Sequence, residues 1–380
     1  MGRIAERRDA ALAADPGRDP AELPMILRRI AAILFLPLML AFGTGVYLYM
    51  GTLKSKVVRE HAQLPTVTKP KFVLPGTMFV VQEGRLFKLK DGGFSEVGPA
   101  GDWSQPAITP DHTQLLAVSH TGFASDLYLL STDGKVIKRL TSDGSRIIDG
   151  NHWAYYPRVT PDGSSVVYSY DSPKFGYTVD FSIWSMPLNG TQRQARLRAQ
   201  GNRNTGGLTN PIPISSTGIL YVSHSIDQST VVHSTIVLQS HPGAVSKPLT
   251  DPADDCSQPA LSPDGSQLAM ICRAGKQTTR LEIAPFNGTA LGPARTILEG
   301  GLYAQPTWSP DGKALAYFAP AGATGHFQLW YLSLAAALTP VPSTSGGATP
   351  AADVFPTPQP TPVQVTQGVD LSATSPPAWY

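Results

Sequence analysis

The chain has 380 residues, of which 42% are hydrophobic and 15% charged, with 35 glycines and 35 prolines. This composition excludes a chain that is disordered throughout, and favours short strands joined by tight turns over a helical bundle. The formal net charge of +2 gives no support for nucleic-acid binding, and two cysteines are too few for a disulfide scaffold or a four-ligand zinc site.

The first predicted element is a transmembrane helix over residues 30–53. This range contains no charged residue, and about 20 apolar residues are enough to cross the hydrocarbon layer of a bilayer. A cleavable signal peptide is the alternative, but the apolar run is longer than such peptides use and no clear small-x-small cleavage site follows it. The segment is therefore interpreted as a signal anchor that holds the protein to a membrane.

Basic residues near the helix ends predict the orientation. Residues 1–29 contain six arginines, with the pair Arg28–Arg29 directly beside the helix, and residues 54–72 contain five lysines and arginines. Because the side richer in basic residues stays in the cytoplasm, we expect residues 1–29 to form a cytoplasmic tail. Residues 54–72 are then a linker to an extracytoplasmic domain that spans residues 73–380.

One short sequence recurs through this domain: Pro, two residues, Ser or Thr, then Pro-Asp and a small residue. Copies begin at Pro106, Pro157, Pro259 and Pro306, and a degenerate copy covers residues 214–218. The Ser/Thr positions 109, 160, 215, 262 and 309 are 51, 55, 47 and 47 residues apart. A period slightly above 40 residues is typical of a β-propeller blade.

Each repeat unit predicts four antiparallel strands. In the first complete unit the Pro-Asp turn follows the first strand, apolar runs follow at residues 115–119 and 126–130, and Asp133-Gly134 forms a tight turn before a fourth strand at 136–140. Pro and Asp are turn formers, and Asp-Gly is a strong hairpin signal. Four antiparallel strands make one blade.

The two ends of the domain predict a sixth blade. Residues 77–97 contain three strands without a preceding one, whereas residues 376–380 match the first strand at 305–309 without a following one. We expect the C-terminal strand to pair with the strand at about 77–82, which closes the ring and removes an exposed sheet edge. The fold class is thus all-β, a six-bladed β-propeller closed by the C-terminal strand and preceded by one transmembrane α-helix.

The last unit is longer than the others. From position 309 to the equivalent position 380 there are 71 residues, against 47 in the preceding units. Residues 340–362 are rich in Pro, Thr, Ser, Ala and Gly, a composition that does not pack a core. They are predicted to be a disordered surface insertion between the third and fourth strands of this blade.

These motifs resemble the TolB-like six-bladed propellers built from WD-like repeats, which also occur at the N-terminus of prolyl and dipeptidyl peptidases. The resemblance is carried by Asp126–Gly134, by Arg139-Leu-Thr141 and by Trp308-Ser-Pro-Asp-Gly312. It covers about residues 73–380 and implies the fold. The N-terminal mixed α/β domain of TolB and the hydrolase domain of the peptidases have no counterpart in this sequence, so TolB's partner and the peptidase activity are not carried over.

The best candidate binding site is a ring of polar residues, here called the channel ring. In a propeller the first strand of each blade lines the central channel, and the residue before each motif Pro takes an equivalent place. These residues are Gln105, Tyr156, Asn210, Gln258 and Gln305. Such a ring could bind a polar ligand or a peptide end by convergent hydrogen bonds, or it could hold only channel water.

No catalytic motif is found: the sequence lacks a Gly-x-Ser-x-Gly elbow, a His-Glu-x-x-His motif and a Gly-rich phosphate loop. His120 and His224 both follow a second strand and are interpreted as solvated loop histidines in preference to a ligand or metal site. The acidic group Asp251, Asp254 and Asp255 is interpreted as an exposed loop in preference to a calcium site. No catalytic residue, metal site or cofactor is predicted.

Cys256 and Cys272 are predicted to form a disulfide bond. The turn at 262–266 joins the first and second strands of their blade, and if Leu261 lies opposite Gln267 the two cysteines face each other across the hairpin. Two unrelated buried thiols are the alternative. Because disulfides persist mainly outside the cytoplasm, the bond would agree with the predicted orientation.

Together these features predict a membrane-tethered, extracytoplasmic propeller that serves as a binding or scaffold module for a protein or peptide on one propeller face. The alternative from another class is an enzyme, a hydrolytic propeller with a metal ion at the channel mouth. That reading requires carboxylates around the channel, whereas the channel ring contains amides and a phenol.

Overall fold

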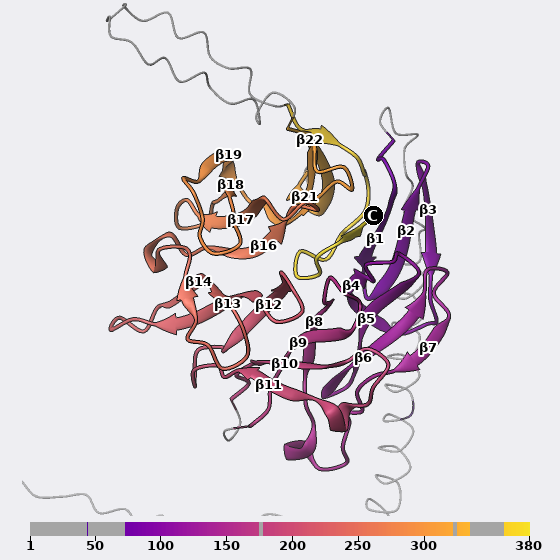
Figure 1. Cartoon of the computed structure of the whole chain (residues 1–380). Helices are drawn as coiled ribbons and strands as arrows, with labels where there is room; N and C mark the ends of the chain where they lie inside the picture. The colour runs from indigo at the N-terminus through magenta and orange to yellow at the C-terminus, as the bar shows by residue number, and fades with distance from the viewer. Residues whose placement is uncertain (1–43, 45–72, 175–177, 322–324, 335–360) are drawn as a thin grey trace, which may run out of the picture. The chain divides into compact units, whose positions relative to one another are not determined.

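The computed structural model describes Thr44 and residues 73–174, 178–321, 325–334 and 361–380. Within these ranges the strands form six four-stranded antiparallel sheets that follow one another around a central axis (Figure 1). The all-β, six-bladed propeller expected from the repeat is therefore confirmed. The transmembrane helix predicted at residues 30–53 lies outside the described residues apart from Thr44, and no helix among the described residues is long and apolar enough to cross a membrane.

The strands follow the predicted order of four per blade. Blades 1 to 3 comprise β24 (Ala378–Trp379), β1 (Thr77–Gln82), β2 (Arg85–Lys90) and β3 (Gly93–Val97); β4 (Asp102–Ile108), β5 (Gln114–Thr121), β6 (Ala124–Ser131) and β7 (Val136–Arg139); and β8 (Ala154–Val159), β9 (Ser165–Tyr170), β10 (Ser182–Pro187) and β11 (Arg196–Ala199). Blades 4 to 6 comprise β12 (Leu208–Pro213), β13 (Ile219–Ile226), β14 (Val232–Gln239) and β15 (Lys247–Pro248); β16 (Ser257–Leu261), β17 (Gln267–Arg273), β18 (Thr279–Pro285) and β19 (Arg295–Gly301); and β20 (Ala304–Trp308), β21 (Ala314–Pro320), β22 (Phe327–Ser333) and β23 (Val363–Gln364). Short 3-10 helices occur between blades or strands at η1 (Ile148–Gly150), η2 (Gln192–Gln194) and η3 (Pro252–Asp254).

The C-terminal strand closes the ring as predicted. In β24, Trp379 pairs with Met78 and Ala378 pairs with Phe79 of β1. The backbone N–H of Thr77 donates to the Tyr380 carbonyl at 2.7 Å, and the Tyr380 N–H donates back to Thr77 at 3.0 Å. Figure 1 shows the C-terminus beside β1. The first blade is thus assembled from both ends of the domain, which leaves β1 with a partner on each side.

The hydrophobic core is divided among the spaces between neighbouring blades. Each of the six buried clusters takes its residues from two adjacent sheets. In β5, for example, Leu115 packs in the cluster shared with blade 1, whereas Leu116 packs in the cluster shared with blade 3. Because successive side chains of a strand point to opposite faces, both faces of each sheet are buried. This explains why the central strands are apolar over their whole length.

The strands on either side of the predicted insertion are paired. Trp330 of β22 lies opposite Gln364 of β23, and Tyr331 lies opposite Val363. Residues 334–362 therefore connect the third and fourth strands of blade 6, the connection in which the insertion was expected. Residues 335–360 lie outside the described residues, so the predicted disorder of residues 340–362 stays a prediction.

Candidate functional site

All five residues of the channel ring lie at β-bulges. Between Ser104 and Ala107 the pairing of β4 with β5 shifts by one residue, so that two residues of β4 oppose one residue of β5. The same shift occurs in the innermost strands of blades 3 to 6. At each bulge the ring residue has a φ of 50–52°, and a proline follows it. A bulge leaves a backbone group unpaired, which suits proline because proline has no N–H to donate.

The side chains of Gln105 and Gln258 connect neighbouring blades. The Oε1 atom of Gln105 accepts the backbone N–H of Tyr156 at 2.6 Å, and that of Gln258 accepts the backbone N–H of Gln305 at 2.7 Å. Each amide thus binds the equivalent bulge residue of the next blade. Neither of these two glutamines is among the residues that line the central cavity. The prediction that Gln105 and Gln258 line the channel is therefore corrected. Each carboxamide binds the backbone N–H of a bulge residue in the next blade.

The other members of the channel ring line the cavity. Tyr156, Asn210 and Gln305 contribute to its wall, and burial raises the pKa of the Tyr156 phenol. Gln305 also joins blades 6 and 1, since its Nε2 donates to the carbonyl of Ala373 at 2.9 Å. Ser375 joins blades 1 and 2 by accepting the backbone N–H of Gln105 at 2.7 Å. The structure therefore places Tyr156, Asn210 and Gln305 in the cavity wall. Gln105, Gln258 and Gln305 each join neighbouring blades, and Gln305 has both positions.

The central cavity has a volume of about 400 Å³ and is bounded by the innermost strands of all six blades. Its wall is mainly apolar, with Ile108, Leu261 and Trp308 among the larger side chains and with prolines from five blades. His112, Pro263 and Pro310 belong to the first hairpin turns of their blades and also line it, so the cavity reaches the face of the propeller where these hairpins turn. A concave, mostly apolar site with few polar groups is typical of ligand binding.

A single residue of the wall, Arg158, carries a permanent positive charge within the part of the chain that the structure describes. It lies on β8, two residues after Tyr156, and is half-buried. Burial lowers the pKa of its guanidinium to about 10, which still leaves the group protonated at neutral pH. No Asp or Glu is among the described residues of the cavity wall. The sequence analysis did not single out Arg158, although it is the charged residue nearest to a ring position in the repeat.

His120 and His224 occupy equivalent positions in blades 2 and 4. The Nε2 atom of His120 lies 2.8 Å from the Ser104 hydroxyl, and that of His224 lies 3.0 Å from the Thr209 hydroxyl. Burial lowers the pKa of both imidazoles, so both are mainly neutral at neutral pH. They are half-buried between hydroxyl groups of adjacent strands, and the reading of both as solvated loop residues is corrected.

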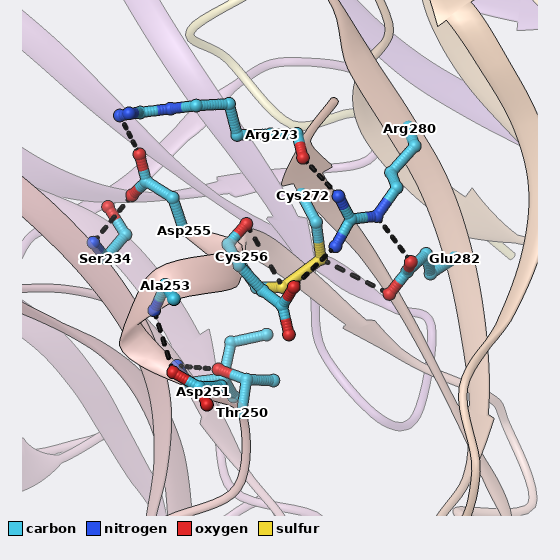
Figure 2. The surroundings of a disulfide bond; sticks show 12 residues. Ser234, Thr250, Asp251, Ala253, Asp255, Cys256, Cys272, Arg273, Arg280 and Glu282 are labelled. Carbon is cyan, nitrogen blue, oxygen red and sulfur yellow. Dashed lines mark hydrogen bonds and ion pairs between the residues drawn. A yellow bond between two sulfur atoms is a disulfide. The ribbon is translucent and has the colours of Figure 1, made fainter. Parts of the chain in front are cut away.

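The acidic residues before blade 5 are occupied by protein partners. Asp251 accepts the Ala253 N–H at 2.9 Å and caps η3. Asp254 pairs with Arg280 at 2.9 Å, and Asp255 pairs with Arg273 (Figure 2). Asp255 also accepts the backbone N–H of Ser234. These carboxylates stabilise the loop, in keeping with the reading that preferred a loop to a calcium site.

Cys256 and Cys272 are joined by a disulfide bond, with their sulfur atoms 2.05 Å apart (Figure 2). The pairing next to the turn differs from the one assumed: Leu261 lies opposite Leu268, one residue further along than Gln267. The bulge at Gln258 removes this difference, because Ser257 lies opposite Ile271 beyond it. The cysteines therefore meet by a register that the hairpin turn alone does not produce.

Glu282 lies beside the disulfide, with a carboxylate oxygen 3.5 Å from the Cys272 sulfur. These three residues are the one group of potential metal ligands that the described part of the chain brings together. A cysteine binds a metal ion through its thiolate sulfur, and the two sulfur atoms of a disulfide are not thiolates. Glu282 instead accepts a hydrogen bond from Arg280 Nε at 2.6 Å.

Comparison with known proteins gives matches of structure only. No protein-family model matches the sequence, and no curated protein is significantly similar to it. TolB from Acinetobacter baumannii superposes with a TM-score of 0.56 at 17% identity, over 82% of this chain and 68% of that chain. A putative TolB from Agrobacterium tumefaciens gives 0.46 at 17% identity, over 68% and 85% of the two chains.

The propeller of a peptidase is also similar. A puromycin-hydrolyzing peptidase from Mycobacterium tuberculosis gives a TM-score of 0.46 at 15% identity, over 70% of this chain and 42% of that chain. At identities this low, structural similarity shows the fold alone and says nothing of activity or partners. The expected resemblance to TolB and to the propellers of prolyl-type peptidases is confirmed at this level, and the chain has the six-bladed β-propeller fold found in TolB.

Proposed function

We propose that the protein is a membrane-tethered, extracytoplasmic binding module whose propeller takes up a segment of a protein or peptide at the mouth of its central cavity. The observation that carries this proposal is the cavity itself, which has apolar walls, a few polar groups and a volume of about 400 Å³. It reaches the face formed by the first hairpin turns, where an extended segment can enter from solvent.

Two features support the predicted location. Residues 30–53 are free of charged residues and follow the Arg28–Arg29 pair, as expected for an anchor with a cytoplasmic N-terminus. The Cys256–Cys272 disulfide is a bond that persists mainly outside the cytoplasm.

Binding is preferred to metal-dependent hydrolysis because of the donor groups around the cavity. A hard cation takes six or more oxygen ligands, mainly carboxylates and carbonyls. Among its described residues the cavity wall has Arg158, the amides of Asn210 and Gln305, and no Asp or Glu side chain. A positive side chain in the wall repels a cation and attracts an anionic group.

Photo-crosslinking in membranes that contain the full chain tests the proposal. A photoreactive amino acid in place of His112, which lines the cavity mouth, should give a defined adduct with another polypeptide. The same amino acid in place of Val245, which is 94% exposed and outside the cavity wall, should not. Absence of an adduct from His112 and from a second wall position, Thr307, would contradict the proposal, as would the same adduct from Val245.

A further inference from the structure

Six equivalent positions, one from each blade, form a second ring in the cavity wall. Each lies two residues after the bulge position of its innermost strand, or after Pro376 in blade 1. These residues, here called the inner ring, are Ala107, Arg158, Ile212, Ala260, Thr307 and Ala378, and all six line the cavity. Four of them are Ala or Thr, so the ring leaves open volume at its level. Arg158 is its one charged member.

The guanidinium of Arg158 has few protein partners. Its Nη1 donates to the carbonyl of Pro157 at 3.2 Å, and it makes no ion pair with the residues that the structure describes. A guanidinium has five N–H donors, and a half-buried cation without a counter-ion is unfavourable. Burial is the one cause that shifts its pKa, downward to about 10, which agrees with the absence of a nearby carboxylate.

Two arginines on outer strands, Arg139 of β7 and Arg280 of β18, contrast with Arg158. Arg139 pairs with Asp126 at 2.6 Å, and Arg280 pairs with both Asp254 and Glu282. In these cases the chain supplies a carboxylate for a partly buried guanidinium. Arg158 instead lines a mainly apolar cavity, where an external carboxylate could pair with it.

The chemistry of the cavity around Arg158 favours a carboxylate over a phosphate as its anionic ligand. A planar guanidinium matches a carboxylate with two parallel hydrogen bonds, and a single cation balances the single charge of a carboxylate better than the double charge of a phosphate. The rest of the cavity wall is mainly apolar, with Ile212, Leu261 and Trp308 among its larger side chains. An aliphatic or aromatic group attached to the carboxylate would therefore be removed from water when the anion reaches Arg158.

We propose that Arg158 is the anion-recognition residue of the central cavity, and that the ligand is a peptide end in which a carboxylate is attached to an apolar or aromatic residue. This inference rests on the proposed function and specifies its ligand. The carboxylate of a C-terminal residue and that of an Asp or Glu side chain share this chemistry, and the experiment distinguishes between them.

Ligand-observed NMR on the full chain in detergent micelles tests the inference with three probes. N-acetylphenylalanine presents a terminal carboxylate on an aromatic residue, and N-acetylphenylalaninamide is its neutral counterpart. The α-amide of N-acetylaspartic acid presents a side-chain carboxylate without an apolar group. The first probe should bind at least tenfold more tightly than either of the others. Preference for the aspartate probe would assign the site to side-chain carboxylates and overturn the terminal-carboxylate inference.

Variants assign the preference to one side chain. Arg158→Gln keeps hydrogen-bond donors without the charge, and should remove the preference for N-acetylphenylalanine over its amide. Arg158→Lys keeps the charge without the planar fork and should retain part of it. Arg146→Gln changes an exposed arginine outside the cavity wall and should behave as the unaltered protein does. Melting temperatures show that each variant is folded.

Three results would overturn the inference: equal binding of acid and amide to the unaltered protein, unchanged preference in Arg158→Gln, or no binding of any probe. The photo-crosslink from position 112 separates this failure from failure of the proposed function. An adduct that persists in Arg158→Gln shows a binding module that does not depend on the arginine. Absence of an adduct from both position 112 and position 307 while Arg158 is intact shows that the binding proposal itself is wrong.

Discussion

At the scale of single residues, the repeated Ser/Thr-Pro-Asp sequence is explained by one hydrogen-bond pattern. In blade 5 the Ser262 hydroxyl donates to Asp264 at 2.6 Å, while the backbone N–H of Gln267 donates to the Ser262 oxygen at 2.9 Å. The same pattern recurs in blades 2, 3 and 6. The hydroxyl is buried and the carboxylate is exposed, so the turn is held by a small, locally satisfied network.

This network predicts an acid-dependent contribution to stability. Hydrogen bonds from Ser262 and Ser266 lower the pKa of Asp264 to about 2. Because the pKa is lower in the folded than in the unfolded chain, the stabilisation is complete above about pH 4 and is lost as the pH falls towards 2. Asp264→Asn should lower the free energy of unfolding at pH 5 by about 1 kcal/mol or less, since the group is exposed to solvent, and by less at pH 2.

Denaturant titrations at these two pH values measure the effect. Asp149→Asn, at an exposed aspartate in η1, serves as the control and should leave the free energy of unfolding unchanged. If Asp264→Asn is equally destabilising at both pH values, the carboxylate acts through shape and not through its charge.

At the scale of elements, the bulge in the innermost strands of blades 2 to 6 introduces one extra residue, which shifts the register of the first hairpin. At Gln105 and Gln258 it also directs the side chain towards the next blade. Non-glycine residues at positive φ are unfavourable unless their surroundings compensate. At Gln258 the compensation is the hydrogen bond to Gln305. Gln105 and Gln258 therefore help to hold neighbouring blades together.

Replacing Gln258 with Ala should destabilise the protein. The Gln305 N–H would lose its acceptor in a position where Gln305 is 4% exposed, and an unsatisfied buried donor costs about 1–3 kcal/mol. The sequence analysis, by contrast, assigned Gln258 to a channel ring that could bind a ligand. Urea unfolding measures the difference in free energy.

Two further variants make this test specific. Gln258→Glu keeps an acceptor oxygen and should be less destabilising than Gln258→Ala. Gln277→Ala, at an exposed position, should have no effect. A Gln258→Ala variant as stable as the unaltered protein would show that the blade-to-blade hydrogen bond contributes nothing.

At the scale of the whole molecule, stability depends on closing the ring. Trp379 packs in the core cluster between blades 6 and 1, and Ala378 packs in the cluster between blades 1 and 2. The Trp379 indole also donates to the carbonyl of Pro75 at 2.6 Å. Residues from the last strand thus take part in two of the six cores, and they connect segments about 300 residues apart.

Deleting residues 376–380 should therefore lower the melting temperature by about 10 °C or more. Loss of a buried Trp alone costs about 3–5 kcal/mol, and 1 kcal/mol corresponds to roughly 2–4 °C in a domain of 150–250 residues. Removing residues 343–360 from the predicted insertion is the matched control. That deletion should leave the melting temperature nearly unchanged, because loop length adds little closure entropy. Circular dichroism follows both transitions, and equal melting of the truncated and full chains would refute closure by β24.

Much of the architecture was predictable because it repeats. The Pro-Asp turns, the apolar strands and the spacing of the anchors are local features, and each one recurs in register, so the number of blades and the closing strand followed from the sequence. The two cysteines were also paired correctly, although the assumed register at Leu261 was wrong by one residue and the bulge at Gln258 compensated for it. The membrane anchor, the orientation and the disorder of residues 340–362 remain predictions.

The direction of the side chains around the channel was decided by tertiary structure. Gln105 and Tyr156 are 51 residues apart, yet the carboxamide of one binds the backbone of the other, and no local pattern contains that contact. Arg158 likewise looks like an ordinary strand residue in sequence. Its place in an apolar cavity whose described wall contains no Asp or Glu follows only when six strands meet around one axis, because the charge and volume of that space are set by residues from every blade.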